Sequence, residues 1–368
     1  MGDTYPHIRV TGTPRDRGRQ YGEQARDRVQ RSVELYRAIF AQYAGWDWAR
    51  VTAHATTYRP AIERAHPRYL EEIVGIAAGA DLAPEDVLAL NVRTEIMFAA
   101  IARRAAGECT SFAVLPGGSA GGHTLLGQNW DWKPGCVDTT VVLEAVQDEG
   151  PRYVTVVEAG LLAKTGLNAH GIGLAANSLV SDLDRGDPGL PYHVILRAIL
   201  DARNLTDALD AVQHHPRSAS ANYLVASREG MAVDIETAPG DHANVWLAWP
   251  DPDHLVHTNH YTCDTGRKDV MRWYSPDSPF RHRRASTLLA DARGRAHPAQ
   301  LQALMRDHVN GPSGICTHPD PALPAMEQDM TVASVLYDLD TLTMWIADGQ
   351  PCEHEYRRIE YAGFLLGT

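Results

Sequence analysis

Cys109 stands where the chain changes character, because the hundred residues before it read as helical and several strand pairs follow it. Gly107 and Glu108 precede it, and Thr110 and Ser111 supply hydroxyl groups directly after it. A cysteine attacks as the thiolate, so it needs a base that takes its proton and a partner that orients this base. A lone cysteine is more often a small buried apolar residue. Residue type alone leaves both interpretations open.

The residues after Cys109 favour a β-hairpin. Strand-like runs at 110–115 and 124–129 flank a loop that holds four glycines. A closed hairpin brings the amide and the carboxylate of Gln128-Asn129-Trp130-Asp131 beside the first strand. The simpler reading of Asp131 is a turn carboxylate after the second strand. We therefore expect either a nucleophile with polar partners or an ordinary hairpin.

Seventeen histidines raise the question of a metal site. His254, His257 and His260 follow one another at intervals of three, which on a helix would suit zinc. The run at 253–261 is strand-like, however, so His254 and His260 share one face while His257 points the other way. We expect ordinary strand histidines here or a site role for Asn259, and no metal. Acyl transfer needs an oxyanion donor, which the side-chain amide of Asn259 could supply.

Several motifs occur in order along the chain: Arg-Gly-x-x-x-Gly at 17–22, Cys-Thr-Ser at 109–111, Gln-Asn-Trp-Asp at 128–131, Val-Glu-Ala-Gly at 157–160, a glycine-rich segment to 178, and His-Thr-Asn-His at 257–260. Together they resemble the acyl-coenzyme A:6-aminopenicillanic acid acyltransferase family. These isopenicillin N acyltransferase-like proteins of peptidase family C45 are self-cleaving N-terminal-nucleophile hydrolases. The resemblance implies an α+β fold, a four-layer αββα sandwich of antiparallel sheets preceded by a helical N-terminal segment.

The resemblance also implies roles for individual residues. Cys109 is expected to be the nucleophile, and cleavage between Glu108 and Cys109 to free its α-amino group as general base, whose pKa is about 7.7–8.0. Asn259 is expected to donate to the oxyanion, Asp131 to orient the amino group or a neighbouring donor, and Ser111 to assist cleavage. The expected substrate-binding residues are Thr110, Asn129, Trp130, Ser220 and His260.

Cleavage would divide the chain into residues 1–108, a helical small chain, and residues 109–368, the catalytic large chain, which together form one structural domain. The expected partners are this N-terminal fragment, held as an αβ heterodimer, and a small-molecule amide or acyl donor. We expect hydrolysis of a linear amide, with transfer from a coenzyme A thioester as the alternative. A metal hydrolase using the histidines and a catalytically silent binding protein are the competing classes.

The sequence departs from the family pattern at two places, which affect the expected self-cleavage and the expected substrate recognition. Family members have glycine directly before the nucleophile, whereas here Glu108 occupies that position and Gly107 lies one place earlier. If cleavage needs a strained backbone, Glu108 would slow it. The fungal enzymes carry an arginine near the position of Ile315, where this chain has Thr317 and His318 instead. We expect substrate recognition to differ accordingly.

Composition excludes several other functions. The 46 acidic residues exceed the 34 basic ones, giving a net charge of −12, which disfavours a nucleic-acid partner. Neither a signal peptide nor a membrane-spanning run is evident, so we expect a soluble cytoplasmic protein. No dinucleotide or phosphate-loop motif occurs, and no cofactor is expected. The five cysteines are widely spaced, without a C-x-x-C pair, and suggest neither a disulfide framework nor a structural zinc site.

The elements that must position Cys109 follow from periodicity and turn residues. A long helix is predicted over 13–44, with Thr13 as N-cap, Pro14 in the first turn and Gly45 as the stop. Gly18 and Gly22 in this helix predict a close neighbour. Further helices are expected at 46–65, 68–80, 84–103, 191–201, 206–214, 279–292 and 298–308. Strands are expected at 139–146, 152–158, within 160–178, and at 221–227, 231–237, 253–261, 331–339 and 341–347.

Overall fold

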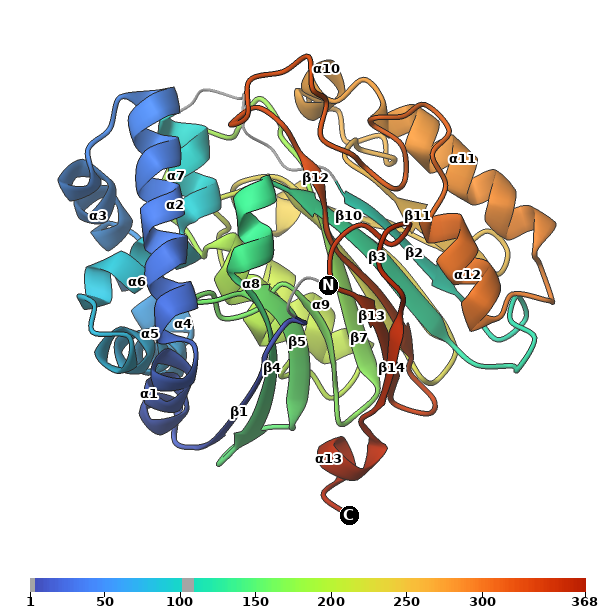
Figure 1. Cartoon of the computed structure of the whole chain (residues 1–368), viewed down its shortest axis with the longest axis horizontal. Helices are drawn as coiled ribbons and strands as arrows, with labels where there is room; N and C mark the ends of the chain where they lie inside the picture. Colours follow the sequence, from blue (N-terminus) through green and yellow to red (C-terminus); the bar gives the residue numbers. More distant parts are fainter. Residues whose placement is uncertain (1–3, 101–108) are drawn as a thin grey trace.

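The computed structural model describes residues 4–100 and 109–368. Two β-sheets pack face to face, and helices cover their outer faces (Figure 1). One sheet has eight strands in the order β1-β4-β5-β6-β7-β8-β9-β10, and the other has six in the order β11-β2-β3-β12-β13-β14. This is the four-layer αββα sandwich that the resemblance implies.

The strands have the following bounds. The eight-stranded sheet contains β1 (His7–Gly12), β4 (Thr140–Gln147), β5 (Tyr153–Glu158), β6 (Thr165–Asn168), β7 (Ile172–Ser178), β8 (Ala221–Ser227), β9 (Met231–Thr237) and β10 (Val245–Ala248). The six-stranded sheet contains β2 (Cys109–Val114), β3 (Leu125–Trp132), β11 (His254–His257), β12 (Met330–Asp338), β13 (Thr343–Ala347) and β14 (Arg357–Glu360).

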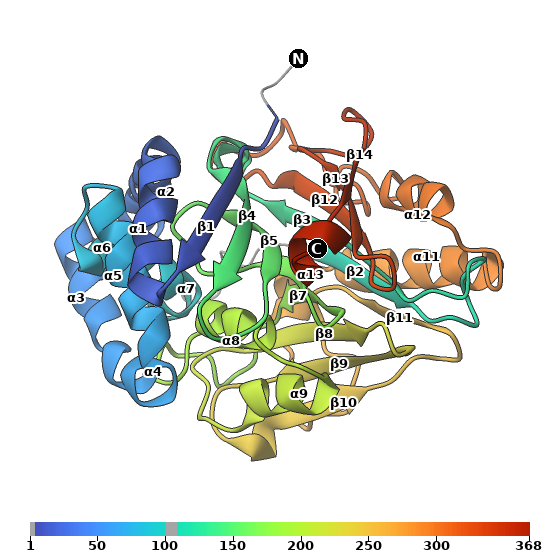
Figure 2. The same ribbon diagram turned by 90° about the horizontal axis from the view of Figure 1, so that it is seen from below.

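The helices fall into groups by the layer they form. The N-terminal group is α1 (Pro14–Gln24), α2 (Arg26–Ala44), α3 (Trp48–Thr56), α4 (Arg59–Ala65), α5 (Pro67–Gly79), α6 (Pro84–Asn91) and α7 (Arg93–Ala100). Against the eight-stranded sheet lie α8 (Tyr192–Ile199) and α9 (Leu205–Gln213) (Figure 2). Against the six-stranded sheet lie α11 (Ser278–Asp291) and α12 (Pro298–Met305). The remaining helical elements are short: α10 (Met271–Tyr274), α13 (Ala362–Leu366) and the 3-10 turns η1 (Pro134–Asp138) and η2 (His242–Asn244).

Alternation along β2 decides which side chains face the interior between the sheets. Cys109 and Ala113 belong to the large core shared by both sheets, whereas Phe112 and Val114 pack in a second cluster with residues of α11 and α12. Successive side chains of a strand point to opposite faces, so Ser111 shares the inner face with Cys109. The predicted hairpin is confirmed, with Cys109 opposite Trp130.

The two glycines of the predicted first helix do mark a close approach. A Cβ at Gly18 would lie 2.1 Å from the carbonyl oxygen of Glu72, and one at Gly22 would lie 2.2 Å from that of Ile76. Both contacts are with α5, whose own Gly75 approaches α1 in the same way. Only glycine permits this spacing between two helix backbones.

Several predicted boundaries were wrong. The helix over 13–44 is interrupted at Ala25, where φ is −113° and ψ is 20°, although Thr13 and Gly45 cap its two ends as predicted. The helix over 84–103 is divided at Val92. The strand over 253–261 is limited to β11, while β3 extends to Trp132, so Asp131 lies within a strand and not in a turn. The apolar spacing continues through both helix breaks, which is why it does not reveal them.

Three strands were not predicted: β1, β10 and β14. The first of these changes the description of the fold, because β1 pairs parallel with β4. The eight-stranded sheet is therefore not wholly antiparallel, and the N-terminal segment is not wholly helical. Ile8 and Val10 are buried between exposed neighbours, which is the period of two expected for a strand.

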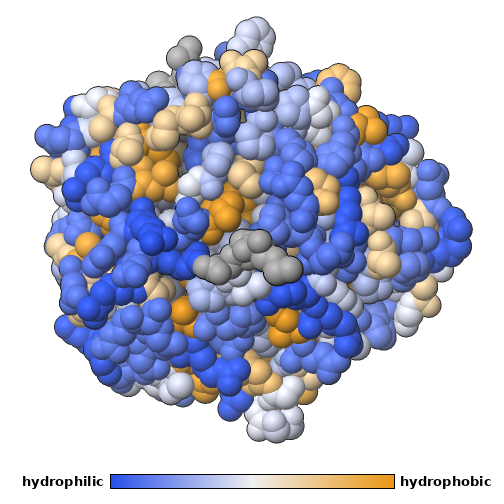
Figure 3. Space-filling model, viewed as in Figure 1, coloured by the Kyte–Doolittle hydropathy of each residue, from blue (hydrophilic) through white to orange (hydrophobic). Residues whose placement is uncertain are grey.

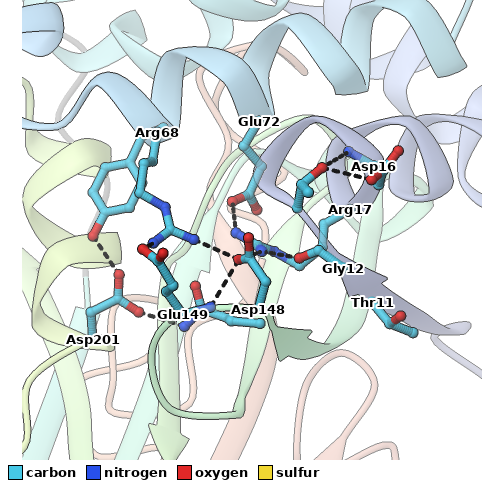
Figure 4. A network of polar contacts seen from close by, with 12 residues as sticks. Thr11, Gly12, Asp16, Arg17, Arg68, Glu72, Asp148, Glu149 and Asp201 are labelled. Carbon is cyan, nitrogen blue, oxygen red and sulfur yellow. Dashed lines mark hydrogen bonds and ion pairs between the residues drawn. The ribbon is translucent and has the colours of Figure 1, made fainter.

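A buried arginine joins the N-terminal helices to the large sheet (Figure 4). Arg17 of α1 is 1% exposed, and it donates to Glu72 of α5 at 3.0 Å and to Asp148, after β4, at 3.3 Å. Arg68 of α5 pairs with the same Asp148 at 2.5 Å and with Glu149. Removing one partner of such a buried pair leaves an uncompensated charge, which is strongly destabilising.

No helix among residues 4–100 and 109–368 combines the length and the apolar character that crossing a bilayer requires. The face of the molecule in Figure 3 is mainly hydrophilic, with hydrophobic residues in small, separate patches.

Candidate active site

Side chains from three different elements hold the backbone of Cys109. Its N–H donates to Oδ1 of Asn259 at 2.8 Å. Its carbonyl oxygen accepts from Nη1 of Arg281, on α11, at 2.9 Å and from Nδ2 of Asn177, on β7, at 3.1 Å. Arg281 also donates to Oδ1 of Asn259 at 3.1 Å. The first residue of β2 is thus fixed on both of its backbone polar groups.

The environment of the Cys109 thiol acts on its pKa in two directions. The side chain is buried, and this burial raises the pKa of the thiol because it penalises the thiolate. The positive charge of Lys164 and a hydrogen bond from the backbone N–H of Asp131 favour the thiolate, whereas the carboxylate of Asp131 opposes it. The net shift is upward, so the thiol needs a base before it can attack.

Lys164 lies in the core, between the two sheets. Its ammonium group donates to the carbonyl oxygen of Ala176 at 3.1 Å and to the hydroxyl of Tyr192 at 3.0 Å. Burial lowers the pKa of Lys164, while the nearby Cys109 raises it. A cation here can therefore stabilise negative charge on the sulfur.

Two cavities lie near Cys109. A cavity of about 20 Å³ borders the thiol, and its walls include Arg93, Met97, Phe98, Trp130, Lys164 and Tyr192. This volume holds about one water molecule. A second cavity of about 730 Å³ is lined by Ser275 and Asp277 among others. These two residues contact Arg281 at 3.4 and 2.6 Å, so the wall of the large cavity touches the side chain that holds the Cys109 carbonyl.

The structure brings three of the predicted site residues to the thiol side of β2. Ser111 shares the inner face and donates to Oδ1 of Asn177 at 2.6 Å. Trp130 is the cross-strand partner of Cys109 and lines the small cavity. Asn259 holds the N–H of Cys109, and its Nδ2 donates to the carbonyl oxygen of Ser178 at 3.0 Å. Asn259 thus accepts the N–H of Cys109 through Oδ1 and donates to Ser178 through Nδ2.

Asp131 contributes through its backbone and through a chain of hydroxyls. Its side chain is fully buried, and its Oδ1 accepts from the hydroxyl of Thr331 at 2.5 Å. The same hydroxyl accepts from the backbone N–H of Thr317 at 3.0 Å. Because Thr317 lines the large cavity, this chain connects Asp131 to its wall.

Thr110 and Asn129 lie on the other face of the hairpin, toward α11 and α12. The hydroxyl of Thr110 accepts from Arg281 at 3.1 Å. The amide of Asn129 donates to the carbonyl oxygens of Met305 at 2.9 Å and Ile315 at 2.7 Å. These contacts brace the hairpin, and a role of Thr110 and Asn129 in substrate binding stays a prediction.

Ser220 and His260 are also committed to other partners. The hydroxyl of Ser220 donates to Asp184 at 2.5 Å, and Nδ1 of His260 lies 2.8 Å from the hydroxyl of Ser278. Burial lowers the pKa of His260 to about 3, so its ring is neutral near pH 7. His257 pairs with Glu236 at 2.8 Å. Within the described residues the histidines at 254, 257 and 260 form no metal-binding group.

Sequence reasoning missed Arg281, Lys164 and Asn177. Arg281 belongs to the run Arg281-His282-Arg283-Arg284, where sequence alone does not separate one buried arginine from its surface neighbours. Lys164 and Asn177 did carry a signal, because each is a polar residue within an apolar, glycine-rich stretch. Glu108, the residue before the predicted cleavage point, lies outside the described residues.

Comparisons with known proteins identify the same family that the motifs resemble. The family model of the acyl-coenzyme A:6-aminopenicillanic acid acyltransferases matches residues 119–353, more than half of the chain. The 40 kDa form of acyl-coenzyme A:6-aminopenicillanic-acid-acyltransferase from Emericella nidulans is 26% identical over 311 residues, which cover 84% of each chain.

Two solved structures are more distantly similar. A mutant of the conjugated bile acid hydrolase from Clostridium perfringens aligns with a TM-score of 0.47 and 10% identity, covering 68% of this chain and 92% of that one. Penicillin V acylase from Agrobacterium tumefaciens aligns with a TM-score of 0.39 and 14% identity, covering 65% and 83%. The assignment rests on the family match: this chain belongs to the acyl-coenzyme A:6-aminopenicillanic acid acyltransferase family, and it is an enzyme that acts on C–N bonds.

Proposed function

We propose that the protein is a self-cleaving amidohydrolase that hydrolyses a linear amide of a small molecule through a thioester on Cys109. The proposal rests on one observation. Side chains hydrogen-bond to both backbone polar groups of Cys109, and the buried Lys164 lies nearby. Any buried backbone group needs a partner, but here the partners are side chains from distant segments, and the charge of Lys164 acts on the thiol as well.

The first stage is cleavage of the bond between Glu108 and Cys109. The thiol of Cys109 adds to the carbonyl carbon of Glu108, the C–N bond breaks, and the nitrogen leaves with a proton as the amine of Cys109. Water then attacks the resulting thioester, which releases the carboxylate of Glu108 and restores the thiol. Asn259 already accepts the N–H of Cys109, so the new amino group stays in place. Ser111, on the same face, is the proposed hydrogen-bonding assistant.

The second stage uses the freed amino group as general base. Its ordinary pKa of about 7.7–8.0 suits proton transfer near neutral pH. It takes the proton of the thiol and passes it to the leaving amine of the substrate, while Lys164 stabilises the thiolate. The acyl group remains on sulfur until water removes it as a carboxylic acid.

The oxyanion of each tetrahedral intermediate needs a donor, and we propose Nδ2 of Asn259 for it. The nitrogen of this amide carries two N–H donors, and one of them donates to the carbonyl oxygen of Ser178 at 3.0 Å, which holds the amide in place. Asp131 is proposed to act through its backbone N–H at the sulfur and through its carboxylate on neighbouring donors.

The N-terminal fragment is expected to remain bound after cleavage as the second chain of an αβ heterodimer. Strand β1 lies within the eight-stranded sheet, beside β4. Arg93 of α7 forms an ion pair of 2.6 Å with the buried Glu158 of β5, and the indole of Trp132 donates to the hydroxyl of Tyr36 at 2.8 Å. Separation would expose these charges and the strand edge.

The charge of the large cavity favours hydrolysis over transfer from coenzyme A. Its lining includes four carboxylates, those of Asp277, Asp320, Glu327 and Asp329. Arg281 pairs with Asp277 at 2.6 Å and Lys133 with Asp329 at 3.0 Å, so the four carboxylates exceed these two cations. Coenzyme A carries phosphates, and like charges in a shared cavity repel. An uncharged or cationic amide is the better match.

Product analysis tests this function. Mature enzyme is incubated with a panel of N-acyl amines, with and without an acyl-coenzyme A and a free amine, and the products are separated by chromatography and identified by mass. We expect release of carboxylic acid and amine from at least one N-acyl amine, with no requirement for coenzyme A. Amide formation that outruns hydrolysis when water and amine compete would establish acyl transfer instead. The family and the fungal relative make this the second candidate.

A further inference from the structure

Two histidines and two cysteines converge on one point beside the large cavity, in a group that the proposed chemistry at Cys109 does not use. His308, Cys316 and His318 lie in the loop after α12, and Cys352 lies after β13. Nε2 of His318 lies 3.1 Å from Nε2 of His308, 3.6 Å from Sγ of Cys316 and 3.2 Å from Sγ of Cys352. The two sulfurs are 3.6 Å apart, and all four atoms lie within 4.8 Å of one another.

Four of the six separations match the edges of a zinc tetrahedron. Ordinary Zn–S and Zn–N bond lengths put two sulfurs about 3.8 Å apart, a sulfur and a nitrogen about 3.6 Å apart, and two nitrogens about 3.4 Å apart. The four distances between the neighbouring donors fall within about 0.4 Å of those values. Two cysteines and two histidines are also a typical structural ligand set for this metal.

The residues around the cluster supply the support that metal-bound histidines need. Nε2 of the Gln350 amide lies 3.0 Å from Nδ1 of His318, and a carboxylate oxygen of Glu353 lies 4.0 Å from the same ring nitrogen. The nitrogen and the oxygen of such an amide exchange places when the group is flipped. With its oxygen turned to the ring, the amide accepts the Nδ1–H and leaves Nε2 free for a metal. Two thiolates and two neutral imidazoles would balance the charge of Zn²⁺.

We propose that His308, Cys316, His318 and Cys352 bind one Zn²⁺ ion that ties the loop after α12 to the segment after β13. The loop carries part of the wall of the large cavity, because Thr317 and His318 both line it. The ion would therefore fix this wall without taking part in the chemistry at Cys109. His308 and Cys352 are exposed, which gives the metal a route of entry.

The experiment measures metal in the full-length protein and does not depend on its activity. Protein stripped with a chelator under reducing conditions is incubated with Zn²⁺ or Co²⁺, desalted, and analysed for metal content. The Co²⁺ form is also examined for the absorption bands of tetrahedral thiolate coordination. His308→Ala and Cys352→Ser remove ligands, Gln350→Ala removes the neighbour of His318, and Cys263→Ser and His242→Ala are matched controls outside the cluster.

We expect about one zinc per chain in the wild type and in both controls, and less than about a tenth of that in the two ligand variants. The Gln350→Ala variant is expected to bind zinc about 10-fold more weakly. Absence of stoichiometric zinc from folded wild-type protein would overturn the proposal. Equal zinc in the wild type and the ligand variants would overturn it too, as would a disulfide between Cys316 and Cys352 that persists under the reducing conditions. A loss of amidase activity while zinc stays bound would count against the proposed function and would leave the zinc site standing.

Discussion

Cys109 and Cys136 are both buried cysteines, yet their neighbours carry opposite charge. Burial raises the pKa of both thiols, but Lys164 then favours the thiolate of Cys109, whereas the carboxylate of Glu158 raises the pKa of Cys136 further. The Cys136 thiol donates to this carboxylate at 3.2 Å. Burial by itself therefore yields an unreactive thiol, and the neighbouring charge separates a candidate nucleophile from a core residue.

The largest contrast is expected when each sulfur is removed in turn. Cys109→Ala should leave the chain uncut and lower kcat by about 10³-fold or more, because the nucleophile is lost. Cys136→Ala should keep self-cleavage and activity while lowering the free energy of unfolding by about 1–2 kcal/mol. Denaturing gels, turnover assays and urea unfolding measure the three quantities. Turnover by Cys109→Ala equal to that of the wild type would end the role assigned to Cys109.

The next contrast concerns two asparagines that each accept a backbone N–H. Asn259→Ala should lower activity by about 10²-fold or more, because Asn259 holds the N–H of Cys109 and is the proposed oxyanion donor. Asn204 caps α9 in the same manner, away from the site. Asn204→Ala should lower stability by about 1 kcal/mol and leave kcat unchanged. Similar kcat values for the two variants would show that Asn259 acts only as a structural acceptor.

A smaller effect is expected from Lys164→Met, which removes the cation but keeps an apolar stem. The thiolate of Cys109 loses its stabilising charge, so the pKa of the thiol should rise and its alkylation at pH 7 should slow by about tenfold. The pH profile of alkylation separates this effect from a change in access, because only a pKa change moves the midpoint. A slower rate with an unmoved midpoint would assign Lys164 to packing.

Neighbouring charges also decide the pKa of buried carboxylates, and through that pKa they affect the stability of the fold. Burial raises the pKa of Glu158 near Cys136. Burial also acts to raise the pKa of Glu236, but the hydrogen bond and charge of His257 outweigh it and lower that pKa to about 2. His257 lies on β11, beside the strand that begins with Cys109. Glu236 thus contributes stability that is present above its unfolded pKa of about 4.3 and is lost as the pH falls toward 2.

Urea unfolding between pH 6 and pH 2 measures this contribution, which we expect to be about 3 kcal/mol. The pKa of His257 is raised, so its own contribution is lost only as the pH rises through that higher value. Glu236→Gln should remove most of the fall in stability between pH 4 and pH 2. An unchanged fall in this variant would assign the acid sensitivity to other carboxylates.

Short sequence patterns predicted much of the secondary structure that surrounds Cys109. The glycine-rich loop indicated the β2–β3 hairpin, Thr13 and Gly45 marked helix ends, and Gly18 and Gly22 indicated a close helix neighbour. Each is a rule of backbone geometry that acts over a few residues, so it can be read without knowing the fold. The order of the motifs then indicated the family and the sandwich.

Contacts between distant segments could not be read in this way. Arg281 reaches Cys109 from a helix 172 positions away, and its sequence context is that of a surface arginine. Cys316 and Cys352 are separated by 36 positions and match no short metal motif, so their convergence depends on the packing of two loops. Asn129 was predicted at the site because a closed hairpin brings it close, but the pleat turns it to the opposite face.

The identity of the first residue of the large fragment tests the central claim most directly. Purified active protein is separated under denaturing conditions, and each fragment is analysed by N-terminal sequencing and intact mass. The account predicts a fragment that begins at Cys109 with a free α-amine, together with a second fragment that ends at Glu108. Full activity in a preparation that contains only the intact chain of 40.4 kDa would contradict it.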